Sequence, residues 1–169
     1  MIANIEYHTD GKTIKSFYVI QENDVRRGSY ESYYRNGQPC KRGAYKDGKE
    51  DGLWEYFYEN GRLWKKCTYK NGEKDGLYVT YYENGQLGEK CFYKNGEKDG
   101  PYISYREDGR LDTKYVYKDG KRLAGQAAQK YLKEWSKTHH TPKTSKKIIS
   151  AHLNQLDSQI KLAHPRQMA

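Results

Sequence analysis

The sequence predicts a mainly β protein, a single-layer antiparallel β-meander followed by a C-terminal α-helical segment. Three similar stretches begin at Asp51, Asp75 and Asp99, so the chain repeats with a period of 24 residues. Each unit holds two turn signals, such as Asn60-Gly61 and Asn71-Gly72, separated by short runs rich in aromatic residues. A fixed period of roughly 20 to 50 residues indicates stacked supersecondary units, and two turns per unit indicate two strands per unit.

A capping hairpin is predicted over residues 1–25. Its strands are Ile5–Tyr7 and Ile14–Ile20, and they are joined by a turn at Asp10-Gly11 that is out of step with the repeat. Terminal units of repeat arrays are commonly atypical because they cap an open end. Residues 26–122 then form the regular repeat sheet.

Two series of turn signals set the strand register in this sheet. The first is Asn36-Gly37, Asn60-Gly61, Asn84-Gly85 and Asp108-Gly109, and the second is Asp47-Gly48, Asn71-Gly72, Asn95-Gly96 and Asp119-Gly120. Both dipeptides suit two-residue type I′ turns, in which the two central residues have positive φ. A two-residue loop at Asn60-Gly61 places Tyr58 opposite Leu63, Trp54 opposite Cys67, and Gly52 opposite Tyr69.

One face of the predicted sheet is aromatic and is expected to be buried. In the unit that begins at Asp51, this face carries Trp54, Tyr58, Leu63, Cys67 and Tyr69. Each unit also places a tyrosine opposite a glycine, where the ring can cover bare backbone. These pairs are Tyr69 with Gly52, Tyr93 with Gly76, and Tyr117 with Gly100.

The opposite face combines cross-strand pairs with a second aromatic series. The pairs are Glu31 with Arg42, Glu55 with Lys66, Val79 with Lys90, and Ile103 with Lys114. The aromatic residues are Tyr33, Phe57, Tyr81 and Tyr105. Aromatic side chains flanked by charge are enriched at protein interfaces, but these rings could equally stack on one another along the sheet. Both interpretations stay open at this point.

The periodicity changes from 2 to 3.6 after the sheet, which predicts a packing helix over residues 123–138. Its apolar stripe is Ala124, Ala128, Tyr131, Leu132 and Trp135. We expect this helix to fold back over the last strand or the aromatic face, with Trp135 as its anchor, and to hide a sheet edge.

Residues 139–169 form a predicted linker, broken by Pro142, and a basic C-terminal helix. The helix carries a coiled-coil-like seam of Ile149, Leu153, Leu156, Ile160 and Ala163. It is short for independent stability. Packing on the sheet, on the first helix, on a partner or on a second copy all remain open, as does disorder of the isolated chain.

The charge and cysteine content of the chain limit the functions that it can have. The 169-residue chain has a net charge of +9, and residues 125–169 hold 8 basic and 2 acidic residues against 23 and 20 before them. A basic tail favours an acidic partner, a nucleic acid or an anionic membrane, unless it is a solvated helix surface. Cys67 and Cys91 lie two strands apart, too far for a disulfide, and with Cys40 they lack metal-site spacing.

Buried thiols indicate a reducing compartment, and the sequence shows no secretory signal and no membrane-spanning run. We therefore expect a cytoplasmic protein. The sequence also shows no catalytic constellation. No carboxylate or cysteine stands at ligand spacing from His139-His140, and the glycines mark hairpin turns rather than a phosphate loop. We expect no enzyme activity, no metal, no cofactor and no small-molecule substrate.

The repeat unit resembles a known family. Asp51-Gly52-Leu53-Trp54, Phe57-Tyr58-Glu59-Asn60-Gly61 and Tyr69-Lys70-Asn71-Gly72 are similar to the bacterial variant of the MORN repeat found in YwqK-type antitoxin proteins. The resemblance covers about residues 26–121 and implies a sheet that serves as a binding or scaffolding surface. It also implies that the chain binds and neutralises a bacterial toxin encoded nearby. The long helical tail departs from the family pattern.

An antitoxin or immunity protein is therefore the first functional hypothesis. Its partner-binding platform comprises Tyr33, Phe57, Trp64, Tyr81 and Tyr105, with Glu31, Glu55, Lys66 and Lys90 setting the charge register. Rigid aromatic side chains give contact area at little cost in ordering entropy. The alternative is a MORN-type scaffold or adaptor that binds a partner or an anionic membrane through its basic tail. Nucleic-acid binding is least favoured, because the sheet is nearly neutral.

Overall fold

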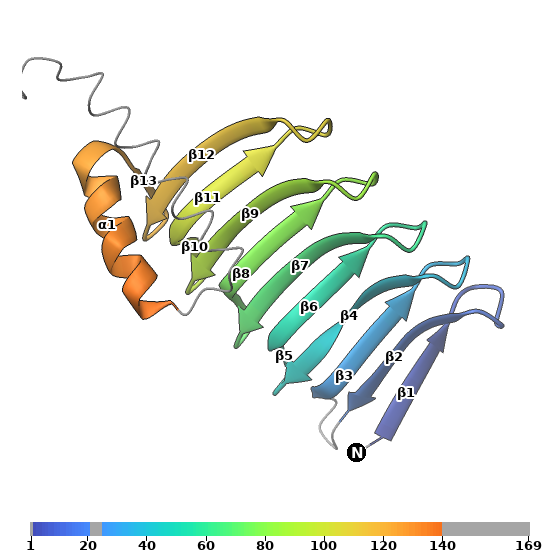
Figure 1. Cartoon of the computed structure of the whole chain (residues 1–169). Coiled ribbons are helices and arrows are strands. Elements are labelled where there is room, and N and C mark those ends of the chain that lie inside the picture. The colour runs from blue at the N-terminus through green and yellow to red at the C-terminus, as the bar shows by residue number, and fades with distance from the viewer. Residues whose placement is uncertain (1, 21–24, 140–169) are drawn as a thin grey trace, which may run out of the picture.

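The computed structural model describes residues 2–20 and 25–139, which form one antiparallel sheet and one helix (Figure 1). The elements are β1 (Ile2–Tyr7), β2 (Ile14–Ile20), β3 (Arg26–Tyr33), β4 (Pro39–Lys46), β5 (Lys49–Glu50), β6 (Gly52–Phe57), β7 (Leu63–Lys70), β8 (Glu73–Tyr81), β9 (Leu87–Lys94), β10 (Glu97–Lys98), β11 (Gly100–Tyr105), β12 (Leu111–Lys118), β13 (Lys121–Leu123) and α1 (Gly125–Thr138). The strands lie side by side in chain order, with β5 and β10 pairing only with β4 and β9. The predicted fold class, a single-layer β-meander with a C-terminal helix, is confirmed.

The two series of turns differ in geometry. In the second series, Asp47, Asn71, Asn95 and Asp119 all have positive φ, as do the glycines that follow them, so the predicted type I′ turns are present. In the first series only the glycine has positive φ, and the prediction is wrong. The Asn60 side chain explains the difference, because its Oδ1 accepts a hydrogen bond from the Arg62 N–H at 2.9 Å while the Gly61 N–H donates to the Tyr58 carbonyl at 2.9 Å.

The extra loop residue shifts the register at one end of each hairpin. Trp54 faces Cys67 and Gly52 faces Tyr69 as predicted, but Leu63 faces Phe57 and not Tyr58. A bulge of this kind moves every later side chain to the other face. Leu63 therefore leaves the tyrosine-bearing face, contrary to the prediction. The same shift recurs at Tyr33 with Pro39, Tyr81 with Leu87, and Tyr105 with Leu111.

The face that carries Trp54, here called the tyrosine face, is built from two rows of aromatic residues. The rows are Tyr30, Trp54, Tyr78 and Tyr102, and Tyr45, Tyr69, Tyr93 and Tyr117. Trp54 is fully buried against Tyr30 and Tyr45, with ring centroids at 5.7 and 5.0 Å. Its indole also fills the space above Gly43, where a Cβ would lie 2.3 Å from the ring, so only glycine fits there.

The predicted buried thiols are confirmed on the same face. Cys67 and Cys91 are each 1% exposed, and both are free. Burial raises the pKa of both thiols. They act as small apolar side chains beneath the tyrosine rings.

A ladder of tyrosine hydroxyls ties each repeat to the next one. Tyr34 donates to the Phe57 carbonyl at 2.7 Å, Tyr58 to the Tyr81 carbonyl at 2.8 Å, and Tyr82 to the Tyr105 carbonyl at 2.9 Å. Arg106 stands at the fourth equivalent position, where no further repeat follows. The ladder thus explains why that position changes from tyrosine to arginine.

Tyr58→Phe is expected to lower the free energy of unfolding by about 1 kcal/mol, because it removes one hydrogen bond between repeats and leaves the Tyr81 carbonyl without it. Urea denaturation followed by circular dichroism measures this. Tyr7→Phe, on an exposed ring of β1, is the control and should change the stability little. Equal effects of the two substitutions would contradict the ladder's role.

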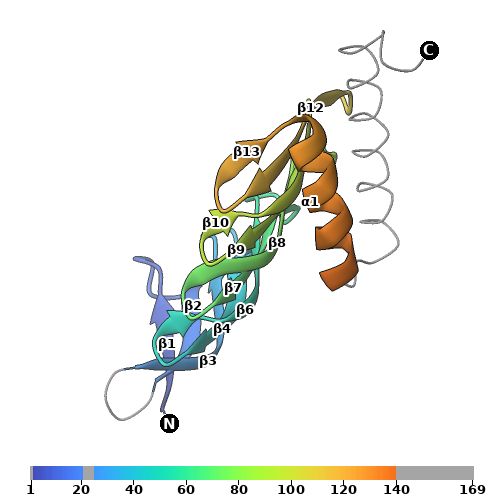
Figure 2. The same cartoon turned by 90° about the vertical axis from the view of Figure 1, so that its left-hand side faces the viewer.

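Helix α1 packs on the face opposite the tyrosines, here called the helix face, at the β13 end of the sheet (Figure 2). Ala128 and Leu132 contact Val116 of β12, and the Trp135 ring meets Phe92 of β9 at 4.7 Å. Trp135 is the anchor that the sequence predicts, but the helix lies beneath the last strands and not on the aromatic face. The Tyr131 hydroxyl adds a 2.5 Å hydrogen bond to the buried Asp99.

The predicted N-terminal hairpin is present. β1 and β2 form a hairpin that joins the sheet through β3. The predicted linker and C-terminal helix of residues 139–169 lie outside the described residues, apart from His139. Among the helices of the described part, none has the length and apolarity needed to cross a membrane.

Candidate protein-binding surface

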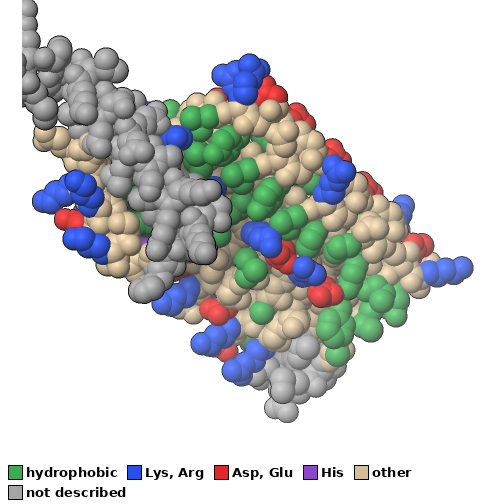
Figure 3. Space-filling view, in the orientation of Figure 1, with side chains coloured by type: hydrophobic (Ala, Val, Ile, Leu, Met, Phe, Trp, Pro, Cys, Tyr) green, Lys and Arg blue, Asp and Glu red, His purple; other side chains and the backbone are tan. Residues whose placement is uncertain are grey.

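The helix face carries an apolar row at the strand ends that adjoin the first series of turns. We call it the aromatic row, and it consists of four cross-strand pairs: Tyr33 with Pro39, Phe57 with Leu63, Tyr81 with Leu87, and Tyr105 with Leu111. Successive pairs are two strands apart, about 9 to 10 Å at ordinary strand spacing. The aromatic rings are half-buried, and Leu111 is 45% exposed. Figure 3 shows hydrophobic side chains running along this face, not covered by α1.

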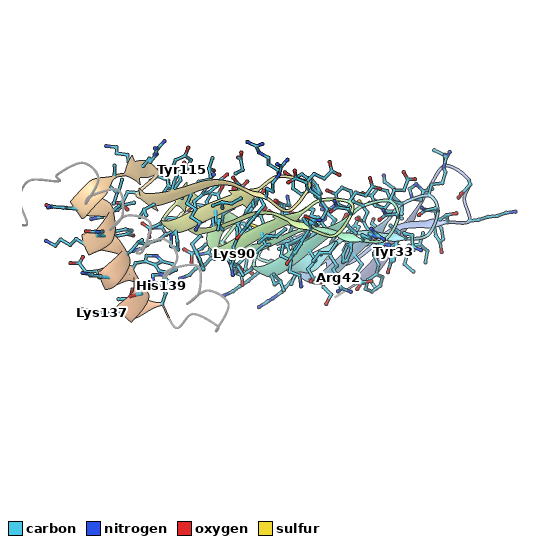
Figure 4. All side chains as sticks on the ribbon, turned by 45° about the horizontal axis from the view of Figure 1, so that its top comes forward. Tyr33, Arg42, Lys90, Tyr115, Lys137 and His139 are labelled. Carbon is cyan, nitrogen blue, oxygen red and sulfur yellow. The ribbon has the colours of Figure 1, made fainter. Side chains whose placement is uncertain are left out.

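A cluster of charges borders the aromatic row. Glu55 forms ion pairs with Arg42 and Lys66, each at 2.7 Å, across three neighbouring strands. The Arg42 guanidinium also lies 5.2 Å from the centre of the Phe57 ring, so the cluster and the row are in contact. Figure 4 shows Tyr33, Arg42 and Lys90 on one side of the sheet and Tyr115 on the other.

Electrostatics hold the Glu55 carboxylate in its charged form. Burial raises its pKa, but hydrogen bonds from Lys66 and Arg42 outweigh burial, and the pKa lies below its ordinary value of 4.5. A carboxyl whose pKa is lowered by folding stabilises the protein above its unfolded pKa. That contribution is lost as the pH falls through the folded pKa.

Glu55→Gln is therefore expected to lower the stability at pH 7 by about 1 kcal/mol, a modest figure because Arg42 and Lys66 are partly exposed. The stability difference between the two proteins should shrink as the pH falls from 4.5 through the lower pKa of the folded Glu55 carboxyl. Denaturation curves at pH 7 and at pH 3 test both parts. A difference that grows on acidification would contradict this assignment.

The remaining charged residues of the predicted site lie on the same face. Glu31 accepts a 2.5 Å hydrogen bond from the Tyr33 hydroxyl and pairs across strands with Arg42. This bond raises the pKa of Tyr33 and fixes its ring at one end of the row. Lys90 pairs with Val79, and burial lowers its pKa.

Trp64 is the predicted platform residue that the structure places elsewhere. Its ring lies 6.3 Å from Tyr56 and 6.2 Å from Tyr58, on the tyrosine face. The bulge beside Phe57 is the reason, since it exchanges the faces of Leu63 and Trp64. Leu63, Leu87, Leu111 and Pro39 join the platform in its place, and the sequence interpretation missed all four.

A shallow cavity of about 330 Å³ lies next to the charge cluster on the helix face. It is floored by small side chains, Ser29 and Ala44, and bordered by Leu53, which is 51% exposed. Ser29 pairs with Ala44 just as Pro101 pairs with Val116 three repeats further along. The cavity thus repeats, near β3 and β4, the position at which α1 packs near β11 and β12.

We compared the chain with models of known protein families. Residues 26–47, 50–71 and 74–95 match the family model described as a MORN repeat variant. Three consecutive repeats of the chain are therefore similar to this variant. Each matched MORN-variant repeat begins in or just before one hairpin and ends at the type I′ turn that follows it. MORN repeats indicate a protein-binding or membrane-binding module, which is consistent with an extended surface on each face.

No curated protein matches this chain. Among solved structures, a mutant of S. aureus TarM in complex with fondaparinux, alpha-GlcNAc-glycerol and UDP is similar at 11% identity and a TM-score of 0.33. The likeness covers 79% of this chain and 24% of that one, so the chain spans about a quarter of that protein's length. A likeness at this level carries no functional information.

Proposed function

We propose that this protein is a non-enzymatic binding module that holds a protein partner on its helix face. The observation that carries the proposal is the aromatic row, a series of four apolar pairs that α1 does not cover (Figure 3), beside the Arg42–Glu55–Lys66 cluster. Binding energy at protein interfaces concentrates in aromatic and arginine side chains surrounded by near-neutral contacts. The row supplies such side chains on paired strands, which limits the entropy lost on binding.

The shallow cavity bordered by Leu53 suggests that the partner contributes a helix to the interface. α1 shows that this sheet packs a helix on the equivalent Pro101–Val116 position, through Ala128, Leu132 and Trp135. The cavity at Ser29, Ala44 and Leu53 has the same place in its repeat, and Glu31, Arg42 and Glu55 also line it. A partner helix could pack there while its flanking residues contact the aromatic row.

The proposed partner is a bacterial toxin that the module neutralises in the cytoplasm. The support for this class of partner is the resemblance of the repeat to that of YwqK-type antitoxin proteins. The surface itself supports tight protein binding, and tight binding is what neutralisation requires.

A capture experiment tests the proposal with two variants matched in chemistry and position. Full-length tagged wild type, Phe57→Ala and Trp64→Ala would be exposed to lysate of the native host. A partner retained by wild type and Trp64→Ala but lost by Phe57→Ala is the expected result, because the two rings lie on opposite faces. The captured protein should arrest growth when expressed alone, and co-expression of wild type should restore growth. Capture that depends on Trp64 would overturn the proposed surface, and a non-toxic partner would overturn the toxin assignment.

Membrane binding is the second candidate function, and one observation favours it. Lys130, Lys133 and Lys137 are all exposed on α1, on the side away from Ala128, Leu132 and Trp135. Flotation with vesicles rich in anionic lipid tests this role. Salt-sensitive binding that is lost on substitution of these lysines by glutamine would support it, and capture of a toxic protein partner with no vesicle binding would exclude it.

A further inference from the structure

The tyrosine face carries repeated positive charges of its own, in addition to the charge cluster on the helix face. Arg26, Lys74, Lys98 and Arg122 occupy equivalent positions in their repeats, with Glu50 at the intervening one. Lys74, Lys98 and Arg122 each pair across strands with a tyrosine of the ring rows. A second line of cations, Lys41 and Lys65, runs parallel to the first, followed by Glu89 at the next equivalent position.

These cations lie on the faces of the aromatic rings. The Lys65 ammonium is 3.6 Å from the centre of the Tyr56 ring, and Lys98 is 4.3 Å from that of Tyr102. Lys74 lies 5.0 Å from the Tyr78 ring, and Lys41 lies 4.9 Å from that of Tyr30. A cation–π contact positions an ammonium group without neutralising its charge.

Few of these cations have an acidic partner. In the described part of the chain, Lys98 forms an ion pair with Glu89 at 3.3 Å, and no ion pair involves Lys41, Lys65 or Lys74. Burial lowers the pKa of Lys65; the charges of Lys74 and Lys41 act in the same direction, and that of Glu50 acts against them. The helix face differs, because its Arg42 and Lys66 share Glu55. The tyrosine face therefore attracts an anion.

The ring geometry selects among anionic ligands. Single-stranded nucleic acids bind proteins by stacking their bases on open aromatic faces. Here ammonium groups occupy those faces at 3.6 to 5.0 Å, so bases cannot stack on them. Carboxylates or phosphates approaching the ammonium groups from above meet no such obstacle.

The spacing of the cations selects the conformation of the ligand. Equivalent cations such as Lys41 and Lys65, or Lys74 and Lys98, are two strands apart, which is about 9.4 to 9.8 Å at ordinary strand spacing. A polyproline-II helix has 3 residues per turn and a rise of about 3.1 Å per residue, so every third side chain points the same way at steps of about 9.3 Å. In an extended β-strand, residues three apart point to opposite sides.

We propose that the tyrosine face binds an acidic polyproline-II segment, with carboxylates at every third residue, that runs across the strands along the line of Lys74, Lys98 and Arg122. Its prolines would lie between the cations, against tyrosine side chains, as proline-rich segments do in aromatic grooves. This site is independent of the aromatic row and goes beyond the proposed function.

Synthetic peptides test this proposal directly on the full-length protein. The probe is a fluorescent (Glu-Pro-Pro)4 peptide, and its matched control is an isomer in which the four glutamates precede the eight prolines. Fluorescence anisotropy at low salt should show that the periodic peptide binds about tenfold or more tightly than the isomer, and that both affinities fall with added salt. Equal binding of the two peptides would overturn the spacing argument.

A matched pair of double variants locates the site. Lys74→Gln with Arg122→Gln should weaken binding of the periodic peptide about tenfold, because each removes a charge-assisted contact. Lys46→Gln with Lys94→Gln removes the same charge from exposed positions outside the tyrosine face and should leave the affinity within about twofold. Circular dichroism shows whether each variant is folded. Equal losses in both variants, or tighter binding to oligothymidine or to anionic vesicles than to the peptide, would overturn the proposal.

Discussion

Trp54→Ala is expected to lower the free energy of unfolding by about 3 to 5 kcal/mol, the range measured for large aromatic residues removed from protein cores. The indole is fully buried in a sheet that has one layer, so no second layer can close the cavity. The substitution also removes ring contacts with Tyr30 and Tyr45 and the 3.1 Å hydrogen bond from the indole nitrogen to the Ala44 carbonyl. Urea denaturation measures the loss.

Trp64→Ala is the matched control, since it removes the same side chain from the next strand. Trp64 is 42% exposed, and its removal should cost about 1 kcal/mol or less. Similar losses for the two variants would mean that Trp54 does not form the centre of the tyrosine face.

Leu132→Ala is expected to destabilise the packing of α1 by about 2 to 5 kcal/mol, because Leu132 is fully buried against Val116 and Ala128. The helix contacts mainly β11 and β12, and so we expect it to detach before the sheet unfolds. Hydrogen exchange should therefore accelerate in residues 128–138, while β6 and β7 keep their protection.

Lys133→Ala, one residue along on the exposed side of α1, should leave exchange unchanged. Unchanged protection of α1 in Leu132→Ala would contradict the packing of this helix. Loss of protection in β6 and β7 together with α1 would show that the helix and the whole sheet unfold as one unit.

The repeat period alone predicts much of this structure. The type I′ turns follow from Asp47-Gly48 and its equivalents, and they fix the pairing of Tyr69 with Gly52. Faces alternate along a strand, so Trp54, Cys67 and Tyr69 are then placed together. These pairings depend only on local turn chemistry, and the turn dipeptide recurs four times in the sequence.

The aromatic row could not be predicted in full, because the same Asn-Gly dipeptide forms two kinds of turn. Asn71 takes positive φ, whereas Asn60 keeps negative φ and bonds Arg62 through its side chain. The one-residue difference decides whether Leu63 or Trp64 joins Phe57. Nothing in the dipeptide distinguishes these outcomes, which depend on the strands that enter and leave the turn.

The position of α1 leaves a clearer signal in the sequence. Glu31 and Glu55 become Val79 and Ile103 at the equivalent positions of later repeats. The latter two are buried, at 5% and 2% exposure. This change from charged to aliphatic distinguishes the half of the helix face that lies toward α1, whose contacts are with β11 and β12, from the half that carries the Glu55 ion pairs.

The measurement that tests the account most directly is the affinity of the captured partner for Phe57→Ala and for Trp64→Ala, determined by calorimetry with full-length proteins. An anchor residue at the centre of an interface contributes about 2 kcal/mol or more, so Phe57→Ala should weaken binding about thirtyfold or more. Trp64→Ala, on the opposite face of the same hairpin, should bind as wild type does. The reverse order would contradict the assignment of the helix face as the partner-binding surface.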